Sequence, residues 1–175
     1  PSELTVPIEI NNGYGDMEIN HISAPEFLLN NDAGYVSFTN IEADTLQVSS
    51  TSGDITINSS FIPDISITSS SGYINLKQTE YVDCSLTAKS GEINIANAVS
   101  HGNLSLQTGS GDISISYQDK PDSLTFDVAS GSEDLSVNFT SADYQIETSA
   151  RKQGIIGKGE YQLTLNSDHG TIVIK

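Results

Sequence analysis

The sequence predicts an all-β fold, a single-stranded parallel β-solenoid (β-helix) of about nine coils of 19–20 residues each. Glycines recur at this interval, and apolar and polar residues alternate on both sides of each glycine. No window keeps the 3.6-residue period of a helix. A fixed period of this size is typical of solenoids and other repeat arrays. The recurring glycines are Gly15, Gly34, Gly53, Gly72, Gly91, Gly111, Gly131 and Gly170.

The first strand of each coil is predicted by two apolar residues, seven and five positions before the glycine. One outward-facing residue separates them, as in a strand with one buried face. The expected core pairs are Ile8/Ile10, Phe27/Leu29, Leu46/Val48, Ile65/Ile67, Cys84/Leu86, Leu104/Leu106, Leu124/Phe126, Tyr144/Ile146 and Leu163/Leu165.

The second strand is predicted by apolar residues two and four positions after the glycine. Glycine suits the corner between the two strands because that corner needs a positive φ or a close backbone approach. A third apolar position closes the opposite corner, so we expect a flattened triangle or two facing sheets. Its members are Ile41, Phe61, Tyr81 or Val82, Val99 and Phe139.

A single domain is expected over residues 1–175, with an irregular segment at about 131–160. Three residues, Ser132–Asp134, follow Gly131 before the next apolar position, where the regular repeat has one, so two residues are inserted. Arg151 occupies the position of a missing glycine. An altered corner explains both departures, and a ligand-binding loop is the alternative. The last strand, Ile172–Ile174, needs a cover over its open edge. Residues 131–160, upstream sequence or a second copy through self-association could supply it.

The charge of the chain limits its partners. It has 23 acidic and 7 basic residues, a formal net charge of −16. This argues against nucleic acid and anionic membranes and favours cations or basic proteins. No apolar run approaches the roughly 18 residues of a membrane span, so we expect no membrane insertion by this segment. Because the chain begins at Pro1 rather than Met, we expect that an upstream segment was removed.

The residues that follow the glycines form a predicted ladder along one edge of the solenoid. We predict a contact surface made of Tyr35, Asp54, Tyr73, Glu92, Asp112 and Arg151. Tyrosine suits contact with glycans and proteins. Glu92 and Asp112 lie on adjacent coils and are the weak candidates for binding a metal ion. The alternative is that acids and tyrosines alternate because this relieves repulsion between like charges.

Catalysis is not expected, and neither is a cofactor. Cys84 falls at a core position. His21, His101 and His169 are spread over the chain without the neighbours of a zinc site. A polysaccharide lyase needs several basic residues in one cleft to stabilise an acidic sugar, and seven in the whole chain are too few.

Several strings resemble the repeat of a bacterial family of proposed adhesins of unknown function. They are TSGDITI at 51–57, KSGEINI at 89–95 and GSGDISI at 109–115, with the ending GKGE at 157–160 and DHGTIVI at 168–174. The resemblance covers nearly the whole chain. It implies a β-solenoid attached to the cell envelope, and in some relatives a place in envelope-stress responses. It supplies no catalytic residues.

We therefore predict a non-catalytic, adhesin-like binding or scaffold module outside the cytoplasm, with a protein or glycan ligand. The alternative is a sensor domain of an envelope-stress system that binds cationic peptides. A polysaccharide-active enzyme is the third hypothesis.

Overall fold

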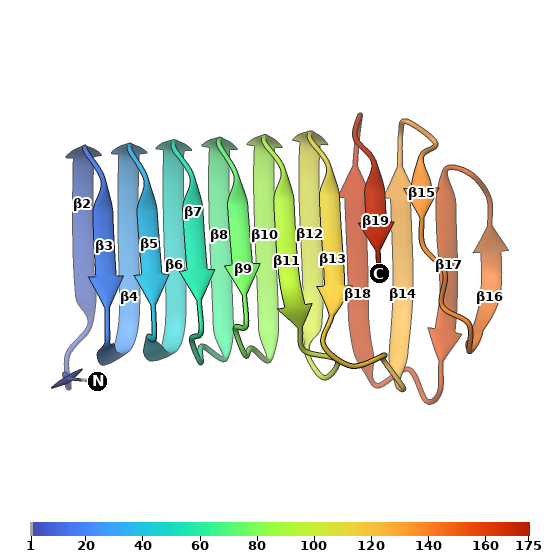
Figure 1. The fold of residues 1–175 in the computed structure, drawn as a ribbon, viewed down its shortest axis with the longest axis horizontal. Coiled ribbons are helices and arrows are strands. Elements are labelled where there is room, and N and C mark those ends of the chain that lie inside the picture. Colours follow the sequence, from blue (N-terminus) through green and yellow to red (C-terminus); the bar gives the residue numbers. More distant parts are fainter. Residues whose placement is uncertain (1) are drawn as a thin grey trace.

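The computed structural model describes residues 2–175 as a two-sheet parallel β-solenoid (Figure 1). The short strands lie over the long strands, so the core is the layer between two facing sheets. The all-β parallel solenoid predicted from the glycine period is confirmed. Over these residues, no helix is long and apolar enough to span a membrane.

The long-strand sheet holds the strands that precede each glycine. It has eleven strands in the described residues. Their bounds are β1 Ser2–Glu3, β2 Ile8–Tyr14, β4 Ile22–Ala33, β6 Glu42–Ser52, β8 Asp64–Ser71, β10 Asp83–Ser90, β12 Asn103–Ser110, β14 Leu124–Ser130, β16 Ala142–Glu147, β17 Arg151–Ile156 and β18 Tyr161–Ser167.

The short-strand sheet holds the strands that follow each glycine. It has eight strands in the described residues. They are β3 Met17–Asn20, β5 Val36–Thr39, β7 Ile55–Asn58, β9 Ile74–Lys77, β11 Ile93–Ala98, β13 Ile113–Tyr117, β15 Leu135–Ser136 and β19 Ile172–Ile174.

Six consecutive turns, from β2–β3 to β12–β13, follow the predicted repeat. Each strand pairs in parallel with its equivalent one period away, as Leu46 does with Phe27 and with Ile65. The inward apolar pairs of these turns are buried from Phe27 onward, while Ile8, Ile10 and Met17 in the first turn are only partly covered. Identical spacing lets every turn repeat the contacts of the one before.

The expectation of about nine coils stacked in chain order is wrong. The strands that follow β12 and β13 in the chain, β14 and β15, do not lie next to them in the sheets. The final strands β18 and β19 lie between the two turns instead. β18 therefore pairs with β12 on one side and with β14 on the other. β19 pairs likewise with β13 and β15. The last strand is thus covered in part by the 131–160 segment.

The glycine register at the end of the chain also differs from the prediction. Ser130 pairs with Ser167, so Glu133 and not Gly131 is the partner of Gly170 at the corner. Glu133 has a positive φ of 61°, which a corner glycine would adopt more easily. The inward pair of this turn is Phe126/Val128, because Phe126 lies beside Leu163 and Val128 beside Leu165.

A β-hairpin, β16–β17, closes this end of the solenoid and is not another coil. β17 runs antiparallel to both β14 and β16. Tyr144 and Ile146 lie in β16 and Arg151 begins β17, so the predicted coil containing them is wrong. An antiparallel hairpin ends the stack because its register does not continue the 19-residue repeat.

The corner opposite the glycines was predicted only in part. Ile41 and Tyr81 are buried as expected, but Phe61 is 49% exposed and the neighbouring Ile62 is buried in its place. The turn into this corner uses residues with positive φ at the same 19-residue interval: His21, Asn40, Ser59, Gln78 and Asn97.

Candidate functional site: the glycine edge

The glycine edge is the row of corners at which each long strand turns into its short strand. From Gly34 to Gly111, and again at Gly170, the glycine lies directly on the backbone of the glycine in the neighbouring turn. A Cβ added to Gly53 would collide with the carbonyl group of Gly34, and φ at Gly53 is +112°. Both space and conformation therefore require glycine here. The edge is a tightly stacked backbone on which the next residue of each turn is displayed.

A buried polar ladder supports this edge from inside. In most turns an Asn, Ser or Thr side chain three positions before the glycine points into the solenoid and forms a hydrogen bond with the backbone at the corner. Asn31 donates from Nδ2 to the Gly34 carbonyl at 3.1 Å and to Ser50 Oγ at 3.1 Å. Thr108 Oγ1 donates to the Gly91 carbonyl at 3.1 Å. The buried members are Asn31, Ser50, Ser69, Thr108, Ser167 and, in the shifted turn, Ser130.

The displayed residues follow one another in the order Asp16, Tyr35, Asp54, Tyr73, Glu92, Asp112, Thr171 and Asp134. Asp134 takes the place predicted for Ser132, because the register of this turn is shifted by two. The structure thus brings five of the six predicted contact residues, from Tyr35 to Asp112, into one row.

Three aspartates of the row also serve the backbone. Asp16 Oδ1 accepts a hydrogen bond from the Tyr35 amide, and Asp54 Oδ1 accepts one from the Tyr73 amide, each at 2.9 Å. Asp112 Oδ1 accepts one from the Thr171 amide at 2.7 Å. Each aspartate therefore ties its turn to the next. The tyrosine rings between them remain free for contact, with Tyr35 37% and Tyr73 48% exposed.

Residues 1–175 match the family model described as Toastrack DUF4097. The chain belongs to this family. No curated protein matches the chain, and no solved structure matches it either. A Toastrack domain is a repeat β-solenoid of unknown function, which agrees with the fold described above.

The charge of this Toastrack domain is unevenly distributed. Residues 1–119 contain fifteen acidic and two basic residues, a formal charge of −13, while residues 120–175 contain eight and five. The glycine edge from Asp16 to Asp112 lies in the first group. A potential of this sign attracts basic partners and weakens as salt screens it.

Glu92 and Asp112 lie on adjacent turns, as the sequence predicted. One oxygen of Asp112 is occupied by the Thr171 amide. Over residues 4–175, no group of three or more His, Cys, Asp or Glu side chains is placed to hold a metal ion. Both carboxylates belong to the displayed row of the glycine edge.

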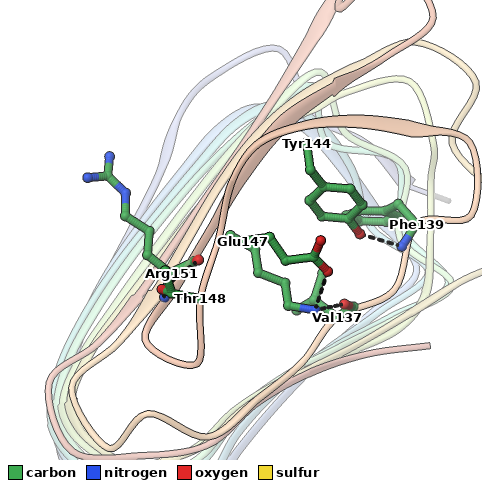
Figure 2. A network of polar contacts seen from close by, with 7 residues as sticks. Val137, Phe139, Tyr144, Glu147, Thr148 and Arg151 are labelled. Carbon is green, nitrogen blue, oxygen red and sulfur yellow. Dashed lines mark hydrogen bonds and ion pairs between the residues drawn. The ribbon is translucent and has the colours of Figure 1, made fainter.

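Arg151 lies apart from the row. Its guanidinium donates two hydrogen bonds to the Asp127 carboxylate, at 2.8 and 2.6 Å. These hydrogen bonds and the negative charge of Asp127 raise the pKa of Arg151. Figure 2 shows Arg151 pointing away from the hairpin interior, where Tyr144 and Glu147 lie. Arg151 therefore does not lie in the row with the other five predicted contact residues.

The hairpin interior is held by a separate set of contacts (Figure 2). The Phe139 amide donates to the Tyr144 hydroxyl at 2.9 Å. Lys152 Nζ donates to the Val137 carbonyl at 2.7 Å and lies 3.6 Å from Glu147. These contacts fasten the hairpin to the loop after β15, so the irregular segment is a packed cap.

One buried thiol and one open groove bear on catalysis. Burial, and secondarily Asp64, raises the pKa of the Cys84 thiol above its ordinary 9.0, so the thiolate is disfavoured at neutral pH. An open groove of about 400 Å³ runs across the outer face of the long-strand sheet, and its lining contains Asp64 and Asp83 but no basic residue. Asp83 Oδ1 accepts a hydrogen bond from the side-chain Nδ2 of Asn103 at 2.8 Å. This lining does not supply the basic cluster expected of a polysaccharide lyase.

Sequence reasoning found the displayed row but missed the buried polar ladder. The sequence does contain a pattern that predicts this ladder, because an Asn, Ser or Thr stands three positions before six of the eight glycines. The exceptions are Ala88, three residues before Gly91, and Val128, three residues before Gly131. Val128 marks the turn in which the register is shifted.

Proposed function

We propose that this Toastrack domain is a non-catalytic, adhesin-like binding module of the bacterial cell envelope. It holds a protein or glycan partner along the glycine edge. The observation that carries the proposal is the row of exposed tyrosines and carboxylates at a constant interval. Tyr35 and Tyr73 lie two turns apart, roughly 9–10 Å, with Asp54 between them.

The edge is suited to binding because it is ordered before a partner arrives. The displayed residues from Tyr35 to Asp112 are attached to stacked glycine corners, and Asp16 and Asp54 accept hydrogen bonds from backbone amides. Little conformational entropy is then lost when a partner is bound. Tyrosine adds an apolar ring for stacking and a hydroxyl for hydrogen bonding.

A direct test uses fluorescent microspheres coated with the purified domain, applied to intact bacterial cells and to isolated peptidoglycan sacculi. The double variant Tyr35→Ala/Tyr73→Ala should lower retention at least about tenfold, since each ring removed costs one or more kcal/mol. The matched control is Phe61→Ala, which removes an aromatic ring of similar exposure from the opposite corner. It should leave retention unchanged.

Two outcomes would contradict the proposal. One is that microspheres coated with the wild-type domain are retained no better than albumin-coated microspheres on either surface. The other is equal loss with the Phe61 variant. Fractionation of cells that produce the protein tests its location. We expect the domain in the fractions outside the cytoplasm.

A second candidate function is a sensor of cationic peptides, favoured by the charge of −13 on residues 1–119. A lysine-rich peptide is the probe. Its affinity should fall as NaCl is raised and in the variant Glu92→Gln/Asp112→Asn. Affinity that does not change with salt would reject the sensor.

A further inference from the structure

The row of corners opposite the glycine edge changes at one place in the regular part of the solenoid, between β11 and β12. Ala96 pairs with Lys77, 19 residues before it. Asn103 pairs with Asp83, which lies 20 residues before it. One residue is therefore added to the corner that joins these two strands. In repeat proteins such insertions lie in loops on one face, which is often the face that binds a partner.

A pocket of about 230 Å³ opens at this enlarged corner. Its lining includes residues 80–82 before β10, residues 99–101 before β12 and residues 118–119 after β13. Each of these loops connects two strands of the stack. A Cβ at Gly102 would lie 3.0 Å from ring atoms of Tyr81, so the glycine lets this ring pack directly against the enlarged corner.

Tyr81 contributes a hydroxyl group without a protein partner. The residue lines the pocket although it is only 5% exposed. Within residues 4–175, every fully buried side-chain oxygen or nitrogen has a hydrogen-bond partner. The Tyr81 hydroxyl has none among these residues, so it must reach solvent, and we infer that it does so through the pocket. A phenol that is otherwise buried favours a ligand that can bond to it.

The rest of the lining combines acidic and apolar groups. Glu80 and Asp119 are exposed, and the lining contains no Lys or Arg. Within residues 4–175, neither carboxylate forms an ion pair. Val82 and Val99 provide an apolar wall beside them. This combination suits an ammonium group on an apolar stem, because such chains bury their methylene groups and keep the charge near the surface.

We propose that this pocket binds a primary ammonium group on an unbranched apolar stem, carried by a free amine or by a lysine side chain of a peptide. The ammonium group lies between Glu80 and Asp119 and donates a hydrogen bond to the Tyr81 hydroxyl. The stem lies against Val82 and Val99. At about 30 Å³ for each non-hydrogen atom, the pocket holds on the order of eight such atoms. This is the size of n-hexylamine.

The proposal is tested by calorimetric titration of the protein with n-hexylamine at neutral pH. The amine should bind at one site, and 1-hexanol, which has the same stem without the charge, should bind at least about tenfold more weakly. The variant Glu80→Gln/Asp119→Asn should weaken binding of the amine by a similar factor. The matched control Glu18→Gln/Asp32→Asn removes the same charges from exposed positions outside the pocket, so its affinity should be unchanged.

A single-atom change tests the role of Tyr81. Tyr81→Phe removes a hydroxyl that has no protein partner, so the melting temperature should be unchanged or higher. The affinity for n-hexylamine should nevertheless fall at least about fivefold, because the bond to the charged group is lost. A tyrosine that only packs in the corner would give no such loss, since the ring is retained.

Two probes distinguish the sources of the ammonium group. Acetyl-Gly-Lys-Gly-amide is titrated beside n-hexylamine, and the tighter ligand shows whether the site takes a lysine side chain or a free amine. The proposal is overturned if neither probe binds, if 1-hexanol binds as tightly as the amine, or if Tyr81→Phe retains full affinity. Equal losses in the Glu80/Asp119 variant and its control would overturn it as well, because binding would then reflect only the net charge.

Discussion

Backbone contact between successive glycines sets the spacing of the turns at the edge. Five of these glycines, from Gly15 to Gly91, have φ between 107° and 153°. In Gly34, Gly53, Gly72 and Gly91 the place of a Cβ is occupied by the carbonyl of the preceding glycine. Side chains are excluded from this row, so the residue after each glycine becomes the outermost one.

We predict that Gly53→Ala destabilises the domain by at least about 2 kcal/mol, because the backbone must move and the positive φ is strained. Urea denaturation measures the loss. Gly13→Ala is the control, since a Cβ at Gly13 meets nothing within 4 Å. It should change stability by less than about 0.5 kcal/mol. Equal losses in the two variants would show that stacking of the glycines is not the cause.

Among the elements, the β16–β17 hairpin is the one that departs from the repeat. Phe126, Gly154 and Tyr144 lie side by side on neighbouring strands. The rings of Phe126 and Tyr144 approach to 5.4 Å between centroids across the glycine. Phe139 contacts the same Phe126 ring at 5.0 Å. This aromatic cluster attaches the hairpin to the end of the core.

Removing the ring of Tyr144 should loosen the hairpin while leaving the solenoid intact. We predict that Tyr144→Ala speeds amide hydrogen exchange in β16 and β17 at least about tenfold, because the ring contact and the bond from Phe139 are both lost. Exchange in β6, β8 and β10 should not change. Asp143→Ala, an exposed neighbour in β16, is the control. Faster exchange throughout the molecule would contradict a separately attached cap.

At the scale of the whole molecule, the order of the turns determines which segments are indispensable. The turn β18–β19 is last in the chain but lies inside the stack, between β12–β13 and β14–β15. Among the described residues, the first turn pairs only with the second turn. In a repeat array an end unit contributes one interface, whereas an internal unit contributes two.

Deleting residues 161–175 should therefore be far more damaging than deleting residues 1–20, although it removes fewer residues. The first deletion exposes the edges of β12, β13, β14 and β15 and the core around Leu106 and Ile115, so we predict aggregation or loss of a cooperative melt. The second should leave a monomer with a lower melting temperature. Light scattering and calorimetry distinguish the two, and similar melting temperatures would contradict this account.

The sequence by itself determined the solenoid, both strands of each regular turn and the row of residues beside the glycines. These features recur at a constant interval, and each depends only on the neighbouring turns. The glycine row shows this from Gly15 to Gly111, where the predicted and observed registers agree.

Only the tertiary structure decided the last third. Leu124, Phe126 and Val128 all point inward, so alternation allows two registers in β14, and pairing with β18 selects one of them. The insertion of β18–β19 depends on contacts between segments up to about 60 residues apart, which no local period encodes.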